Sequence, residues 1–103
     1  MEKRYYKRIH VSIDIIIFLD NSIYYGTLNN CSANGMYIET PFISPLNSLL
    51  KILIPSKKEM VKVTAKVVRR ANAGTTIYQG MGVESINLSN EYLQFIIKLN
   101  HES

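Results

Sequence analysis

The stretch Asn30-Cys31-Ser32-Ala33-Asn34-Gly35 lies between two apolar runs and contains the residue types of a tight bend. Asn and Ser side chains hydrogen-bond nearby backbone groups, and glycine permits a positive φ or a close backbone approach to a ligand. The amide of Asn30 and the hydroxyl of Ser32 are also groups that bind ligands. We therefore expect this stretch to fix a bend between two strands and to carry polar groups on the surface.

Alternating apolar and polar residues on both sides of the bend predict β-strands. Before the bend, one strand begins at residue 11, and a Tyr- and Thr-rich strand covers about 23–30, with Gly26 as a candidate bulge. In the first strand five alternate residues share one side: Val11, Ile13, Ile15, Ile17 and Leu19. After the bend, the pattern predicts strands over residues 36–40, 48–54, 60–70 and about 76–86.

The last segment changes to a helical period. Ser89 can cap a helix over residues 89–100, in which four apolar residues form one stripe: Tyr92, Phe95, Ile96 and Leu99. Strands followed by one helix predict an all-β-dominated fold, a six-stranded antiparallel β-barrel plugged or flanked by a C-terminal α-helix. We expect residues 1–9 to form a basic arm and residues 10–103 to form a single barrel domain that includes the helix.

Composition fits one folded domain. The chain has 103 residues, 47% of them hydrophobic, which is enough for a single core and argues against disorder. The longest apolar run, residues 15–19, is too short to span a bilayer, no signal peptide is visible, and one cysteine cannot staple the fold, so we expect a cytoplasmic protein. The net charge of +4 favours an anionic partner without indicating nucleic acid.

Catalytic and metal-binding patterns are missing from the sequence. It has no Gly-x-Ser-x-Gly elbow, phosphate loop or His-Glu-x-x-His motif. His10, His101 and Cys31 do not have the spacing of a metal-ligand cluster. Strand alternation should turn Cys31 away from Asn30 and Ser32 and make it a buried structural thiol. We therefore expect a protein without catalytic residues, metal or cofactor.

The N-terminus supplies a second group of binding residues. Arg4 and Arg8 lie four residues apart, and a guanidinium can meet a phosphate or the O6/N7 edge of guanine with two parallel hydrogen bonds. The pattern Arg4-x-x-x-Arg8, followed by Asn30-x-Ser32-x-x-Gly35, resembles the PilZ domain family of bacterial cyclic di-GMP receptors. The resemblance covers nearly the whole chain, because residues 67–69, 80–84 and 86–89 resemble the closing strands and helix start of that family.

The resemblance implies a role for each residue of the two motifs. Arg4 and Arg8 would clamp cyclic di-GMP through phosphate and guanine contacts. Asn30 and Ser32 would hold the base or phosphate from the barrel surface, and Gly35 would shape the bend. Separately from the resemblance, Arg4 and Arg8 precede the first predicted strand with no apolar anchor of their own, so we expect the ligand to order the arm, which would pass the signal to an unidentified downstream protein.

Three residues depart from the family pattern. Lys3 stands where another Arg is common, so it is a further candidate for ligand binding that keeps the charge but lacks the planar fork. Asn30 replaces the commoner Asp, and an amide donates as well as accepts. Ser85 stands where a large apolar residue is expected, which affects packing more than binding.

Two other functions remain open at this point. The domain could be a protein adaptor whose ligand site has been lost, although the complete motif counts against this reading. It could also be a small basic barrel that binds single-stranded nucleic acid, which the mild charge disfavours. The salt dependence of binding would separate the nucleic-acid reading from the others.

Overall fold

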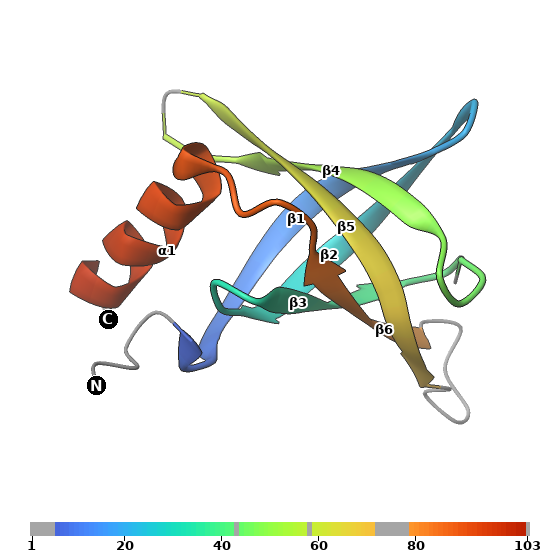
Figure 1. The fold of residues 1–103 in the computed structure, drawn as a ribbon, viewed down its shortest axis with the longest axis horizontal. Helices are drawn as coiled ribbons and strands as arrows, with labels where there is room; N and C mark the ends of the chain where they lie inside the picture. The colour runs from blue at the N-terminus through green and yellow to red at the C-terminus, as the bar shows by residue number, and fades with distance from the viewer. Residues whose placement is uncertain (1–5, 43, 58, 72–78, 103) are drawn as a thin grey trace.

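A computed structural model describes residues 6–42, 44–57, 59–71 and 79–102 of the chain. Its strands form a closed antiparallel barrel in the order β1-β2-β3-β6-β5-β4, with β1 pairing β4 to close it (Figure 1). The elements are β1 Ile9–Leu19, β2 Ser22–Cys31, β3 Gly35–Thr40, β4 Leu49–Pro55, β5 Met60–Ala71, β6 Gln79–Ser85 and α1 Asn90–Glu102. The predicted six-stranded antiparallel barrel with a C-terminal helix is confirmed.

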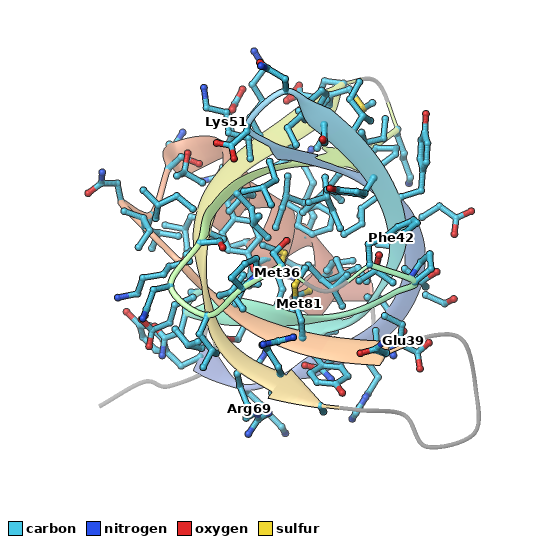
Figure 2. All side chains as sticks on the ribbon, turned by 90° about the vertical axis from the view of Figure 1, so that its right-hand side faces the viewer. Met36, Glu39, Phe42, Lys51, Arg69 and Met81 are labelled. Atoms are coloured by element: carbon cyan, nitrogen blue, oxygen red, sulfur yellow. The ribbon has the colours of Figure 1, made fainter. Side chains whose placement is uncertain are left out.

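The alternation seen in the sequence sets the inner face of the barrel. The inward-facing residues of β1, β4 and β5 are buried and meet in one core: Ile15, Ile17, Leu50, Ile52, Ile54, Val61, Val63, Ala65 and Val67. Figure 2, a view along the barrel, shows Met36 and Met81 inside the ring of strands, whereas Lys51 lies on its outside. Antiparallel strands with one face in the core and one in solvent produce this pattern.

Strand β1 begins two residues earlier than the alternation predicts. Ile9, expected to be the last residue of the arm, pairs with Cys31 of β2 and is only 8% exposed. Its side chain belongs to the core cluster. The barrel therefore fixes the backbone immediately after Arg8.

The prediction of a bulge at Gly26 is wrong. Gly26 pairs regularly with Ile15, and the register between β2 and β3 shifts instead between Leu28 and Asn30. A Cβ on Gly26 would lie 2.8 Å from the backbone oxygen of Glu39. This glycine therefore permits close strand packing, and the irregularity lies next to the bend.

Helix α1 begins as predicted. The Ser89 hydroxyl accepts a hydrogen bond from the Tyr92 amide at 3.1 Å, the geometry of an N-cap. Tyr92, Phe95 and Ile96 reach the barrel core, so α1 packs beside one end of the barrel (Figure 1). The helix ends at Glu102, two residues beyond the expected end. In the described ranges no helix has the length and apolar character needed to cross a membrane.

Candidate functional site

The Asn30 to Gly35 stretch forms the expected bend between β2 and β3. The Ser32 amide donates to the Gly35 carbonyl at 2.9 Å, and the Gly35 amide donates back to the Ser32 carbonyl at 3.3 Å. Within this turn the Asn34 amide donates to the Ser32 hydroxyl at 3.2 Å. The local chemistry of Ser and Asn thus closes the turn, as the sequence predicts.

Gly35 serves this turn through close packing. Its φ is not in the left-handed region, and a Cβ at this position would collide with the backbone carbonyl of Val83 in β6. Gly35 pairs with Glu84, next to that carbonyl. The positive φ considered from the sequence is therefore not needed, and the glycine lets β6 approach the start of β3.

Strand alternation predicts Cys31 and Ser32 on opposite sides, but both side chains are buried, with 0% and 2% exposure. The alternation stops at Cys31 because β2 ends there and Ser32 enters the turn. Burial of the Cys31 thiol itself is confirmed. The expected surface position of the Ser32 hydroxyl is therefore not found: the group is buried and accepts from the Asn34 amide within the turn.

Arg8 and Asn30 meet at the entrance to β1. One guanidinium nitrogen of Arg8, Nη1, donates to Oδ1 of Asn30 at 3.1 Å, across 22 residues of sequence. The pairing of Ile9 with Cys31 and of His10 with Asn30 brings the two residues together. The structure therefore joins one residue from each predicted motif at a solvent-exposed position.

The turn is also held from below by two residues that the sequence did not identify as part of the site. The buried Tyr92 hydroxyl donates to the Ser32 carbonyl at 2.6 Å and lies 3.3 Å from the Gly35 carbonyl, which also accepts. The Ser85 hydroxyl donates to the Ala33 carbonyl at 2.9 Å, and the Ser85 amide donates to the Asn34 carbonyl at 2.8 Å.

The contacts of these two residues explain what the sequence left open. Ser85, which departs from the family pattern, is a hydrogen-bond donor to the turn, whereas a large apolar residue could not donate from its side chain. Tyr92 belongs to the apolar stripe of α1, so its spacing predicts burial but gives no sign of a polar partner. The only signal was that a buried tyrosine usually needs an acceptor for its hydroxyl.

Burial controls the ionisation of the two groups beneath the turn. Burial raises the pKa of the Cys31 thiol to about 12, and the positive charge of Arg8 opposes this only in part. The pKa of Tyr92 is also raised, chiefly by burial and further by Cys31, with Arg8 again acting in the opposite direction. At neutral pH Cys31 is thus a protonated thiol without the thiolate that a nucleophile requires.

Arg4 and Lys3, the remaining predicted binding residues, lie outside the described residues. Among the residues that are described, no three His, Cys, Asp or Glu side chains are grouped so as to hold a metal ion. The chemistry assembled at the turn consists of a guanidinium with five N–H donors, a carboxamide and a hydroxyl. Such a set suits an oxyanion or the polar edge of a base.

Comparison with solved structures supports the six-stranded barrel with a C-terminal helix. The structure of the Bacillus subtilis inhibitor of motility, MotI/DgrA, has a TM-score of 0.75 at 17% identity and covers 92% of this chain. This chain spans 48% of that protein, about half its length. The PilZ domain of Escherichia coli YcgR with c-di-GMP has a TM-score of 0.69 at 19% identity, over 93% of this chain and 90% of the other.

A third structure, the PilZ domain of CeSA from a cellulose-synthesizing bacterium, has a TM-score of 0.66 at 20% identity, over 93% of this chain and 96% of the other. The sequence matches none of the curated proteins with which it was compared. The model of the PilZ domain matches residues 2–100, almost the whole chain. The barrel, the flanking helix and this match lead to one conclusion: the chain belongs to the PilZ domain family.

Proposed function

We propose that this protein is a receptor for cyclic di-GMP that binds the nucleotide without altering it. The observation that carries the proposal is the hydrogen bond between Arg8 Nη1 and Asn30 Oδ1 at 3.1 Å. It brings together the two motifs by which the sequence resembles cyclic di-GMP receptors. Membership of the PilZ family supports the same ligand, and related domains have been solved with c-di-GMP.

The arrangement suggests how the ligand is held. Arg8 uses one N–H on Asn30, which leaves other donors of its planar fork for a phosphate or for guanine O6 and N7. Because Oδ1 of Asn30 already accepts from Arg8, the NH₂ of the amide is the part that would donate to the ligand. Ser32, whose side chain is only 2% exposed, would act by holding the turn, and Arg4 would supply the second guanidinium.

Signalling would use the arm before Arg8. Ile9 is anchored in the core, so binding need not order the chain from that residue onward. Ordering residues upstream costs roughly 1–2 kcal/mol of backbone entropy each, which charge-assisted contacts from Lys3 and Arg4 to phosphates would offset. Binding would then change which surface the basic arm presents to a partner.

Calorimetry tests the proposal directly. Cyclic di-GMP should bind, while GTP, cyclic AMP and a short single-stranded oligonucleotide should bind much more weakly. Arg8→Ala should lower the affinity about fivefold to a hundredfold, since a bidentate Arg contact is worth roughly 1–3 kcal/mol. Arg70→Ala, at an exposed arginine of β5, is the matched control and should bind like wild type.

Three results would refute the receptor proposal. One is the absence of cyclic di-GMP binding by folded protein. Another is an Arg8→Ala variant with wild-type affinity. The third is chromatographic detection of linearised nucleotide in proportion to protein after prolonged incubation, which would indicate an enzyme.

Amide hydrogen exchange tests the role of the arm. Saturating cyclic di-GMP should increase protection of the amides before Arg8, whereas the paired amides of β4 and β5 should change little and serve as an internal reference. If the arm amides are strongly protected without ligand, or gain no protection with it, the arm does not carry the signal.

A further inference from the structure

The outer surface of β1 carries apolar residues that the ligand site does not use. Residues 15–19 are apolar without interruption, so this strand is apolar on both faces, whereas a strand with one solvated face should alternate. Ile15 and Ile17 are buried in the core. Ile16 and Phe18 therefore point to the outside of the barrel, where both are only partly buried.

Strand pairing extends this apolar surface across the neighbouring strands. Ile16 lies between Tyr25 of β2 and Leu53 of β4, and Phe18 lies between Ile23 of β2 and Lys51 of β4. Directly paired residues on one face contact each other. Ile23 and Tyr25 are 55% and 68% exposed, which is high for such large apolar side chains. We call this surface the outer apolar face: Ile16, Phe18, Ile23, Tyr25 and Leu53.

Lysines line one edge of the outer apolar face. Lys62 of β5 pairs with Leu53, and Lys51 of β4 pairs with Phe18. Lys51, labelled in Figure 2, projects from the outside of the barrel. Apolar residues thus lie on β1 and β2 and at Leu53 of β4, with positive charge along β4 and β5.

The surface is hollowed where the apolar and basic parts meet. A depression of about 500 Å³ is lined by Phe18, Lys51, Leu53, Lys62, Val63 and Thr64. A protruding apolar side chain of a partner could enter it and place a neighbouring carboxylate beside the lysines.

We propose that the outer apolar face is a docking surface for a protein segment that carries an apolar stripe with carboxylates along one side. Exposed apolar side chains on neighbouring strands, rimmed by charge, mark interaction sites. The lysine edge selects an acidic partner and sets the direction in which it lies, because unlike charges across an interface fix register.

A protein segment fits this face better than an anionic bilayer. Asp14, on the outer face of β1, and Asp20, in the turn after it, are both exposed near the two ends of the apolar rows. A flat anionic surface would meet these carboxylates together with the lysines, whereas a protein segment can match the lysines alone. A bilayer also presents no side chain to fill the depression.

The docking surface does not depend on cyclic di-GMP. Arg8 precedes Ile16 by eight residues of nearly extended chain, roughly 26 Å at about 3.3 Å per residue. The two sites therefore occupy opposite ends of β1, and the test below uses no nucleotide.

Site-specific photo-crosslinking in the cells that make the protein tests the proposal. The photoreactive residue p-benzoylphenylalanine replaces Phe18 in the full chain, or Tyr25 as a second position, and the segment attached after irradiation is sequenced by mass spectrometry. Placement at the exposed Glu84 of β6 is the control position. The expected product is a protein segment with apolar residues and Asp or Glu within a few positions, captured at Phe18 and not at Glu84.

Charge reversal completes the test. Lys51→Glu with Lys62→Glu should reduce capture at least fivefold, while Arg70→Glu with Lys98→Glu, which changes the net charge equally at other exposed sites, should leave it unchanged. Circular dichroism checks that both double variants keep the barrel. Equal capture by the two variants, capture of lipid, of a second copy of this chain or of a segment without carboxylates, or no adduct above the Glu84 control would each overturn the proposal.

Discussion

Removal of one hydroxyl should reveal how α1 supports the β2–β3 turn. In Tyr92→Phe the aromatic ring can stay in the core, but the hydrogen bonds to the Ser32 and Gly35 carbonyls, at 2.6 and 3.3 Å, are lost. Each carbonyl keeps one partner across the turn, so neither is left without a hydrogen bond. The unfolding free energy should therefore fall by the net value of one hydrogen bond, about 1–1.5 kcal/mol. The larger penalty for leaving a buried polar group without a partner does not apply.

Urea denaturation followed by far-UV circular dichroism measures this loss. For a domain of this size about 1 kcal/mol corresponds to roughly 4–8 °C in melting temperature. Tyr25→Phe is the matched control, because Tyr25 is 68% exposed and its hydroxyl is expected to contribute almost nothing. Amide exchange at Ser32 and Gly35 should quicken in Tyr92→Phe and not in Tyr25→Phe, since these two amides close the turn.

The result that refutes this reasoning is a Tyr92→Phe variant indistinguishable from Tyr25→Phe in both stability and turn exchange. A stability loss without faster exchange at Ser32 and Gly35 would also contradict it. In that case the hydroxyl would stabilise the core generally and the turn would not depend on α1.

Three further predictions concern the same end of the barrel. Arg8→Lys should restore only part of the cyclic di-GMP affinity lost in Arg8→Ala, because an ammonium lacks the planar fork; full restoration in calorimetry would show that charge alone suffices. Gly35→Ala should destabilise the domain by about 1–3 kcal/mol in urea denaturation, since its Cβ would meet the Val83 carbonyl. Gly82→Ala, whose Cβ would lie 3.5 Å from the nearest side-chain atom, should cost much less, and equal losses would contradict the packing argument. Stability should fall as pH rises from about 9 toward 12, because the folded state keeps the Cys31 proton that the unfolded state, with a pKa of 9.0, releases. Cys31→Ala should lose part of this slope, about 1.4 kcal/mol per pH unit for one proton; an unchanged slope would mean that Cys31 ionises alike in both states.

Side-chain periodicity made much of the fold predictable. In β1 from Ile9 to Ile17 and in β5 from Val61 to Val67 every second residue is apolar, and burial follows that alternation. The helix start was equally clear, because Ser89 has the cap chemistry and precedes a helical stripe. Both signals are local, so the sequence alone contains them.

Features set by distant contacts were not predictable. The bulge near Asn29 shifts the backbone register without changing the residue types, which led to the wrong assignment at Gly26. Ser32 lies beyond the end of β2, and its carbonyl is held by Tyr92, which lies 60 residues away. The resemblance to the family implied that the two motifs share a site, and only the pairing of β1 with β2 shows how Arg8 reaches Asn30.

The supports beneath the turn bear on the energetics of binding. Two backbone hydrogen bonds close the turn, and Tyr92 and Ser85 hold it from α1 and the end of β6. Because these contacts exist without ligand, binding free energy need not be spent on ordering the turn, and preorganisation of this kind raises affinity. Arg8 itself is already positioned by Ile9 and Asn30, so under the proposed function its placement would add little to the cost of binding. In the proposed receptor, a rigid surface joined to a short basic arm would place the conformational response in the arm, where a ligand with two phosphates would bias it most directly.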